Sequence, residues 1–155
     1  MNNYFLGVLT SSFVALIGFL INELLIKPTK EYNEIMFVVE SKYHFYANLL
    51  NNPAFAYDIK PGDNGWDERD EASIEIRKVS CDLHSYLNNR YPFFHYGMLS
   101  KNDIEKLCGD LMLLSNIVCL IANNNNEVKS KNYDMIIKAD REIQDIFRKN
   151  NIKRK

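Results

Sequence analysis

An apolar run near the N-terminus, residues 4–26, constrains this chain more than any other stretch. It contains one charged side chain, Glu23. As an α-helix these 23 residues would be about 34 Å long, enough to cross a hydrocarbon layer of ~30 Å with some tilt. The sequence therefore predicts a transmembrane anchor over residues 1–27, followed by a separate domain over residues 28–155.

The residues that flank the run predict its orientation. The first three residues carry no positive charge, whereas Lys27 and Lys30 follow the run directly. A cleaved signal peptide would need a basic start and a shorter apolar core, so a retained anchor is favoured. By the positive-inside rule the N-terminus lies outside and residues 27–155 lie in the cytoplasm. Glu23, about one turn from the cytoplasmic end, could extend to the headgroups or line the mouth of a pore.

Small and polar residues form a second pattern inside the run. Their spacing of 4, 4, 3 and 4 places them on one helical face: Gly7, Ser11, Ala15, Gly18 and Asn22. Such a face lets two membrane helices approach closely, and Ser and Asn side chains can hydrogen-bond across the contact. Small residues are also common in membrane helices generally. A row of five that ends in an amide favours packing between copies of the chain.

The remainder of the chain shows helical periodicity and no strand-like alternation of useful length. Apolar residues that recur every three or four positions predict helices over residues 29–51, 66–89, 101–122 and 129–149. The expected fold is therefore all-α, with one N-terminal transmembrane helix followed by a cytoplasmic bundle of about four helices. The 29–51 helix should continue the direction of the membrane helix, so that a motion of the bundle could reach the bilayer.

Two of these helices carry more specific expectations. The 101–122 helix is apolar nearly all round, which indicates a core helix or a subunit interface. It is too short and carries too central a charge, Asp110, for a second membrane span. In the last helix the residues expected to face inward are Tyr133, Ile136, Ile137, Ile143 and Phe147.

The charges are balanced in total but unevenly placed. The net charge is -1, which argues against a general coat for long nucleic acids. Residues 58–82 hold eight acidic and four basic side chains, whereas residues 129–155 hold nine basic and four acidic ones. The three cysteines include no CxxC pair and fit a reducing compartment.

Motifs of the common enzyme classes are absent from the sequence. It has no GxSxG, no phosphate-binding P-loop, no HExxH and no dinucleotide-binding glycine motif. No catalytic residue, cofactor or metal site is predicted, although Cys81 and His84 lie on one helix face. A membrane-tethered enzyme that uses Cys81, His84 or His95 is the third alternative, after the two described below.

The stretch over residues 90–101 combines aromatic and basic side chains in a loop. Aromatic faces stack on bases, whereas Arg, His and Lys contact phosphates, so this mixture suits a nucleotide ligand. A loop that closes the end of the bundle, with Phe93 and Phe94 buried, would also explain it. With two residues of the preceding helix added, the candidate ligand-binding residues are Arg77, His84, Arg90, Tyr91, His95, Tyr96 and Lys101.

A neutral domain can bind an anion if several copies each contribute a positive side chain around a symmetry axis. A cyclic oligonucleotide, with several phosphates, would complement such a ring. The ligand is therefore expected to bind between subunits of a homo-oligomer, with a tetramer as the expected form.

The layout of the 4–26 span, the stop at Lys27 and Lys30, and the helical domain with the 90–101 loop resembles a known class. It is similar to small membrane effectors of bacterial antiphage defence, the Csx-type ancillary membrane proteins of type III CRISPR systems. The resemblance implies recognition of cyclic oligoadenylate at the bacterial inner membrane, followed by membrane disruption. The alternative is a membrane-anchored helical adaptor, or a holin-like interaction protein, without a small ligand.

Overall fold

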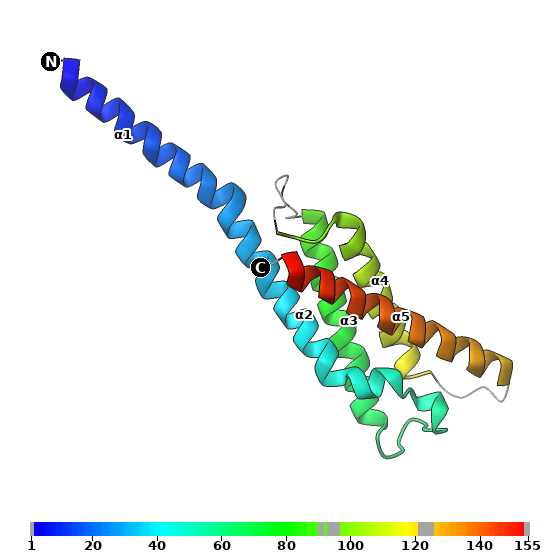
Figure 1. Cartoon of the computed structure of the whole chain (residues 1–155). Coiled ribbons are helices and arrows are strands. Elements are labelled where there is room, and N and C mark those ends of the chain that lie inside the picture. Colours follow the sequence, from blue (N-terminus) through cyan, green and yellow to red (C-terminus); the bar gives the residue numbers. More distant parts are fainter. Residues whose placement is uncertain (1, 90–91, 93–96, 121–125, 154–155) are drawn as a thin grey trace.

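The computed structural model describes residues 2–89, 92, 97–120 and 126–153 (Figure 1). Over these residues the chain is helical and contains no strand. Its elements, in order, are α1 (Asn2–Ile21), the π-helical turn η1 (Asn22–Ile26), α2 (Lys27–Asn51), the 3₁₀ turn η2 (Ala54–Ala56), α3 (Trp66–Asn89), α4 (Lys101–Val118) and α5 (Asn126–Lys153). Because α1, η1 and α2 follow one another without a break, the described residues form four long helices.

The first of these helices has two different halves (Figure 1). α1 extends away from the other helices as an isolated rod, and its described side chains are exposed. α2 packs into a bundle with α3, α4 and α5. Within the described part of the chain, one helix is long and apolar enough to cross a membrane, and it lies near the N-terminus. Its position agrees with the predicted span.

The periodicity of α2 and α3 correctly predicts which side chains they bury. α3 has the predicted bounds, Trp66–Asn89. Both helices place one apolar stripe in the common core, made by Tyr32, Met36, Val39, Tyr43, Tyr46 and Leu50 of α2 and by Ile76, Val79, Leu83, Tyr86 and Leu87 of α3. Burial of such stripes is the main source of helix stability in a bundle.

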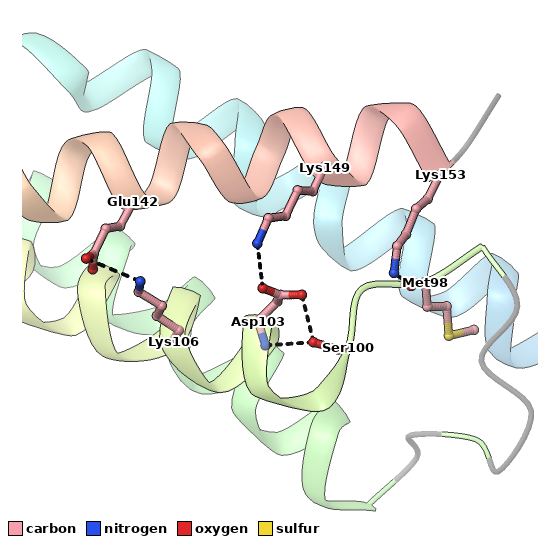
Figure 2. A network of polar contacts seen from close by, with 7 residues as sticks. All are labelled: Met98, Ser100, Asp103, Lys106, Glu142, Lys149 and Lys153. Carbon is pink, nitrogen blue, oxygen red and sulfur yellow. Dashed lines mark hydrogen bonds and ion pairs between the residues drawn. The ribbon is translucent and has the colours of Figure 1, made fainter.

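α4 is a core helix of the bundle, as predicted. Ile104, Leu107, Leu111 and Leu114 are all buried. The helix is capped by Ser100, whose hydroxyl accepts a hydrogen bond from the backbone N–H of Asp103 at 3.1 Å (Figure 2). It ends at Val118, before the predicted residue 122, because the chain forms a turn in which the N–H of Leu120 donates to the carbonyl of Ile117.

α5 is longer than predicted, and three of its five predicted core residues, Ile136, Ile143 and Phe147, are buried. Ile137 is 55% exposed, so its prediction as a core residue is wrong, and Tyr133 is also exposed. The buried residues are Ile136, Ala139, Ile143, Ile146 and Phe147. Ile136 and Ile137 are adjacent and therefore about 100° apart on the helix, so only one of them can point into the core.

The connection between α2 and α3 lies partly against the bundle. Phe55, in η2, is buried, and its ring centroid lies 5.1 Å from that of Tyr133 in α5. Tyr57, in contrast, is 61% exposed. The buried guanidinium of Arg69 donates to the carbonyls of Asn52 and Gly65. It thereby fastens the end of α2 to the start of α3.

Candidate functional site

A groove between α3 and α4 contains one of the predicted ligand-binding residues. The two helices run antiparallel and are joined by two buried hydrogen bonds. The hydroxyl of Ser73 donates to the carbonyl of Ser115 at 2.7 Å, and that of Ser80 donates to the carbonyl of Cys108 at 2.9 Å. The groove has a volume of about 440 Å³ and is lined by Ser80, Cys81, His84, Ser85, Glu105, Cys108, Gly109 and Met112.

Three of the predicted ligand-binding residues lie along this helix pair. His84 lines the groove, and its ring is 3.3 Å from the amide nitrogen of Asn88. Arg77 donates across the helix pair to the side-chain oxygen of Asn116 at 2.8 Å. Lys101 forms an exposed ion pair of 3.9 Å with Glu105, which lines the groove. The other four, Arg90, Tyr91, His95 and Tyr96, lie outside the described residues, as do Phe93 and Phe94.

The groove presents both apolar and polar side chains, with the thiols of Cys81 and Cys108 and the carboxylate of Glu105 among them. Burial, helped by the neighbouring Cys81, raises the pKa of the Cys108 thiol to about 12, so this sulfur stays protonated at neutral pH. The carboxylate of Glu105 adds a negative charge, so an anionic ligand must contact the positive side chains on either side of it. Among the described residues, no three His, Cys, Asp or Glu side chains are placed to hold a metal ion.

The junction between the apolar N-terminal helix and the bundle is the second notable site. Pro28 lacks a backbone N–H and would break an ordinary helix interior. Here the helix continues through it because the preceding turn widens into η1, in which the N–H of Lys27 bonds to the carbonyl of Asn22. π turns of this kind are frequent at functional positions.

Side chains from both parts fix this junction. The hydroxyl of Tyr86, in α3, donates to the carbonyl of Pro28 at 3.0 Å. The hydroxyl of Thr29 donates to the carbonyl of Leu25 at 2.6 Å, and Lys27 pairs with Glu23 at 3.3 Å. The last apolar turn of the rod is therefore attached to the first turn of the bundle.

A mostly apolar groove of about 800 Å³ also lies at the junction. The described residues that line it come from the end of η1 and the first turns of α2: Leu25, Ile26, Thr29, Lys30, Asn33, Glu34 and Phe37. The sequence contained a signal for this groove, because Ile26 and Phe37 lie three helical turns apart on either side of the charged residues.

The predicted membrane-packing face lies on one uninterrupted helix. Gly7, Ser11, Ala15 and Gly18 belong to α1, and Asn22 opens η1; all five are exposed. A Cβ atom added at Gly7 or Gly18 would meet nothing within 4 Å. The Ser11 hydroxyl donates to the Gly7 carbonyl within the helix. The bundle of the same chain therefore makes no use of the glycines on this face.

Polar side chains buried between helices were missed by sequence reasoning. Tyr43, on α2, donates its hydroxyl to Asp140 on α5, and burial raises the pKa of this phenol, with the hydrogen bond to Asp140 as the next cause. Asp110, on α4, has a buried carboxylate oxygen without a hydrogen-bond partner among the described residues. Sequence periodicity marks apolar faces, so it gives no signal for such pairs between distant helices.

No protein-family model, curated protein or solved structure matches this chain. Relatives therefore offer no guide to the role of either groove or of the junction. The function proposed below rests on the fold, the junction and the side chains described above.

Proposed function

We propose that this chain is a single-span membrane protein whose helical bundle acts as a sensor and whose N-terminal helix acts in the bilayer, without enzymatic chemistry. The observation that carries this proposal is the uninterrupted helix over residues 2–51. One half of it is an exposed apolar rod and the other half is part of the bundle core. In the proposed topology the N-terminus is outside the bacterial inner membrane and the bundle is in the cytoplasm.

The junction supports mechanical coupling between the two halves. Because η1 and α2 are helical and Tyr86 holds Pro28, a flexible linker does not separate the span from the bundle. A ligand that changes the packing of α3 would therefore act on the rod through this hydrogen bond. To switch a two-state equilibrium almost fully, such a ligand must prefer one state by about 5.5 kcal/mol.

For the ligand we propose a cyclic oligonucleotide, of which cyclic oligoadenylate is one form. Arg77, His84 and Lys101 lie along the α3–α4 pair and are the described groups suited to phosphates and bases. The ligand would bind between copies of the chain, with four copies as the proposed number. The role in antiviral defence, in which the spans perturb the membrane, is proposed on the resemblance of layout alone.

The test uses the full-length protein in detergent, with a panel of cyclic di-, tri- and tetranucleotides. We expect one of them to raise the melting temperature and to change the mass of the assembly. Arg77→Gln and His84→Gln should reduce that shift, whereas Lys78→Gln, an exposed neighbour on α3, should not. If no cyclic nucleotide changes the melting temperature or the mass, the ligand proposal is wrong. Consumption of a nucleotide would indicate an enzyme.

The alternative, an adaptor without a small ligand, is favoured by the outer face of α2. Phe37 is 68% exposed and Phe45 is 77% exposed, two turns apart on the same helix. Exposed aromatic residues of this kind mark protein contacts. The adaptor is the better interpretation if no cyclic nucleotide has an effect and the double variant Phe37→Gln with Phe45→Gln lowers the mass of the assembly.

A further inference from the structure

Acidic side chains are concentrated at one end of the bundle, where Lys129 also pairs with Asp58 at 3.5 Å. α3 begins at the end of the bundle that is far from α1 (Figure 1), and its first turns are acidic, as is the connection before it. The exposed carboxylates at this far end are Asp58, Asp63, Asp67, Glu68, Asp70 and Glu71. This is the acidic segment of the sequence, and the fold places it away from the span.

The C-terminal end of α5 lies at the opposite end of the bundle, beside the start of α2 (Figure 1). The hydroxyl of Tyr32, in the second turn of α2, donates to the side chain of Asn150 at 2.8 Å. α5 runs antiparallel to α2, so Lys153, three residues further on, lies about 4.5 Å closer to the span. The last turn of α5 is therefore close to the level at which the apolar run ends.

Basic side chains gather at this near end. We define the basic end of the bundle as Lys27, Lys30, Arg148, Lys149 and Lys153. Ile152 lies among them and is 71% exposed. The sequence continues with Arg154 and Lys155, which lie outside the described residues.

Most of these basic side chains lie beside a carboxylate, and Lys27 pairs with Glu23 at 3.3 Å. Lys149 pairs with Asp103 at 3.1 Å, and Lys153 donates to the uncharged backbone carbonyl of Met98 at 2.9 Å (Figure 2). Arg148 lies 3.6 Å from Asp145, an exposed pair within one helix.

Glu31 and Glu34 add negative charge near Lys30, which pairs with Glu34 at 4.0 Å. Exposed pairs at these separations are weak, so a stronger anion can replace the carboxylate partners. Positive charge beside an exposed isoleucine is the combination that lets a surface enter the headgroup layer of an anionic membrane.

We propose that the basic end docks on the anionic lipid headgroups of the membrane that holds α1. This inference rests on the proposed function, because α1 must be inserted for the basic end to be held at the headgroup layer. Docking would fix the tilt of the bundle relative to the bilayer. The acidic far end, repelled by the same headgroups, would point into solution. Since the attraction is electrostatic, it should weaken at high ionic strength.

The test uses tryptophan fluorescence, because Trp66 is the one tryptophan in the sequence and opens α3 at the far end. In a Trp66→Phe background, Ile152→Trp places the fluorophore in the basic end. The full chain is reconstituted in phosphatidylcholine vesicles that carry a nitroxide on the headgroup, with or without about one third phosphatidylglycerol. We expect quenching of the introduced indole to be at least about twofold stronger in the anionic vesicles and to fall at high salt.

Matched charge variants separate this docking from a general charge effect. Arg148→Gln with Lys153→Gln should reduce the quenching to the value in neutral vesicles. Lys131→Gln with Lys138→Gln removes the same charge from the exposed far half of α5 and should change nothing. The protein with its native Trp66 should show no dependence on lipid charge.

Two results would overturn the inference in distinguishable ways. Equal quenching in both lipids, from a protein that floats with the vesicles, removes headgroup docking but leaves the anchor in place. A protein that does not float with the vesicles contradicts the membrane anchor itself, and the docking proposal fails with it.

Discussion

Tyr32 and Asn150 are 118 residues apart, yet the phenol of one donates to the side-chain oxygen of the other at 2.8 Å. Both side chains are fully buried. The same Tyr32 oxygen accepts the backbone N–H of Leu99 at 3.2 Å. One hydroxyl group therefore joins α2, the start of α4 and the end of α5 close to the span.

Tyr32→Phe should lower the free energy of unfolding by about 1–3 kcal/mol, because it leaves buried polar partners without this hydroxyl. Denaturant unfolding of the full chain in detergent would measure the change. Tyr57→Phe is the control, since that hydroxyl contacts Asn52 at 3.3 Å on the surface. A loss no larger than that of the control would show that the buried hydroxyl contributes little.

Arg69→Ala should destabilise the far end of the bundle by about 2–3 kcal/mol, because it removes the charged donor that satisfies two carbonyls. Arg69→Lys should recover only part of the loss, since an ammonium cannot match the fork of donors that reaches Asn52 and Gly65. Thermal unfolding, with the exposed Arg141→Ala as the reference, would measure both changes. Equal midpoints for Arg69→Ala and Arg141→Ala would refute this role.

Asp110 gives the bundle a pH dependence of a defined sign. Burial, together with the neighbouring Glu142, raises the pKa of Asp110 from 3.8 to about 6. Because the folded chain holds this proton more tightly than the unfolded chain does, the stabilisation is present below pH ~4 and is lost as the pH rises through about 6.

Asp110→Asn should therefore raise the free energy of unfolding above pH ~6 by about 1 kcal/mol, after allowance for partial exposure of the carboxyl group. Below pH ~4 it should bring no gain. Unfolding measured across this range tests the sign, with the exposed Asp134→Asn as the control. A gain that persists at low pH would contradict titration of Asp110 as the cause.

Gly7→Leu with Gly18→Leu tests whether copies of the span pack together. Neither substitution meets an atom of the same chain, so the helicity and membrane insertion should not change. Energy transfer between labelled copies in vesicles should fall several-fold if this face is the contact. Ser12→Leu, a substitution off this face, should have no effect, and unchanged transfer in the double variant would place the contact elsewhere.

The buried residues of a helix were predictable from the sequence where its apolar side chains form a single stripe. α2 and α3 each carry a single apolar stripe, so their core residues followed from spacing alone. α5 has isoleucine at adjacent positions, 136 and 137, and the choice between them depends on where α4 lies, which spacing does not report.

The sites were less predictable than the helices. Arg77 and Lys101 lie on different helices, α3 and α4, and only His84 of the predicted ligand-binding residues lines the groove between them. Pro28 lacks a backbone N–H and by itself favours a helix boundary, yet the helix continues through it after the widened turn at η1. Residue propensities predict that proline disfavours a helix interior, but they do not predict that a neighbouring turn can widen to accommodate it.

Because the helix continues through Pro28, residues 2–26 should move as a rigid rod when the bundle tilts. Residues 2–26 are about 37 Å long as a helix, and the bundle grips the next turns through Tyr86 and Pro28. A tilt of about 10° at the bundle would carry the far tip of the rod sideways by about 6 Å, more than the rise of one helical turn. Small rearrangements around α3 are therefore amplified with distance, and the largest displacement falls on the N-terminal tip of the rod.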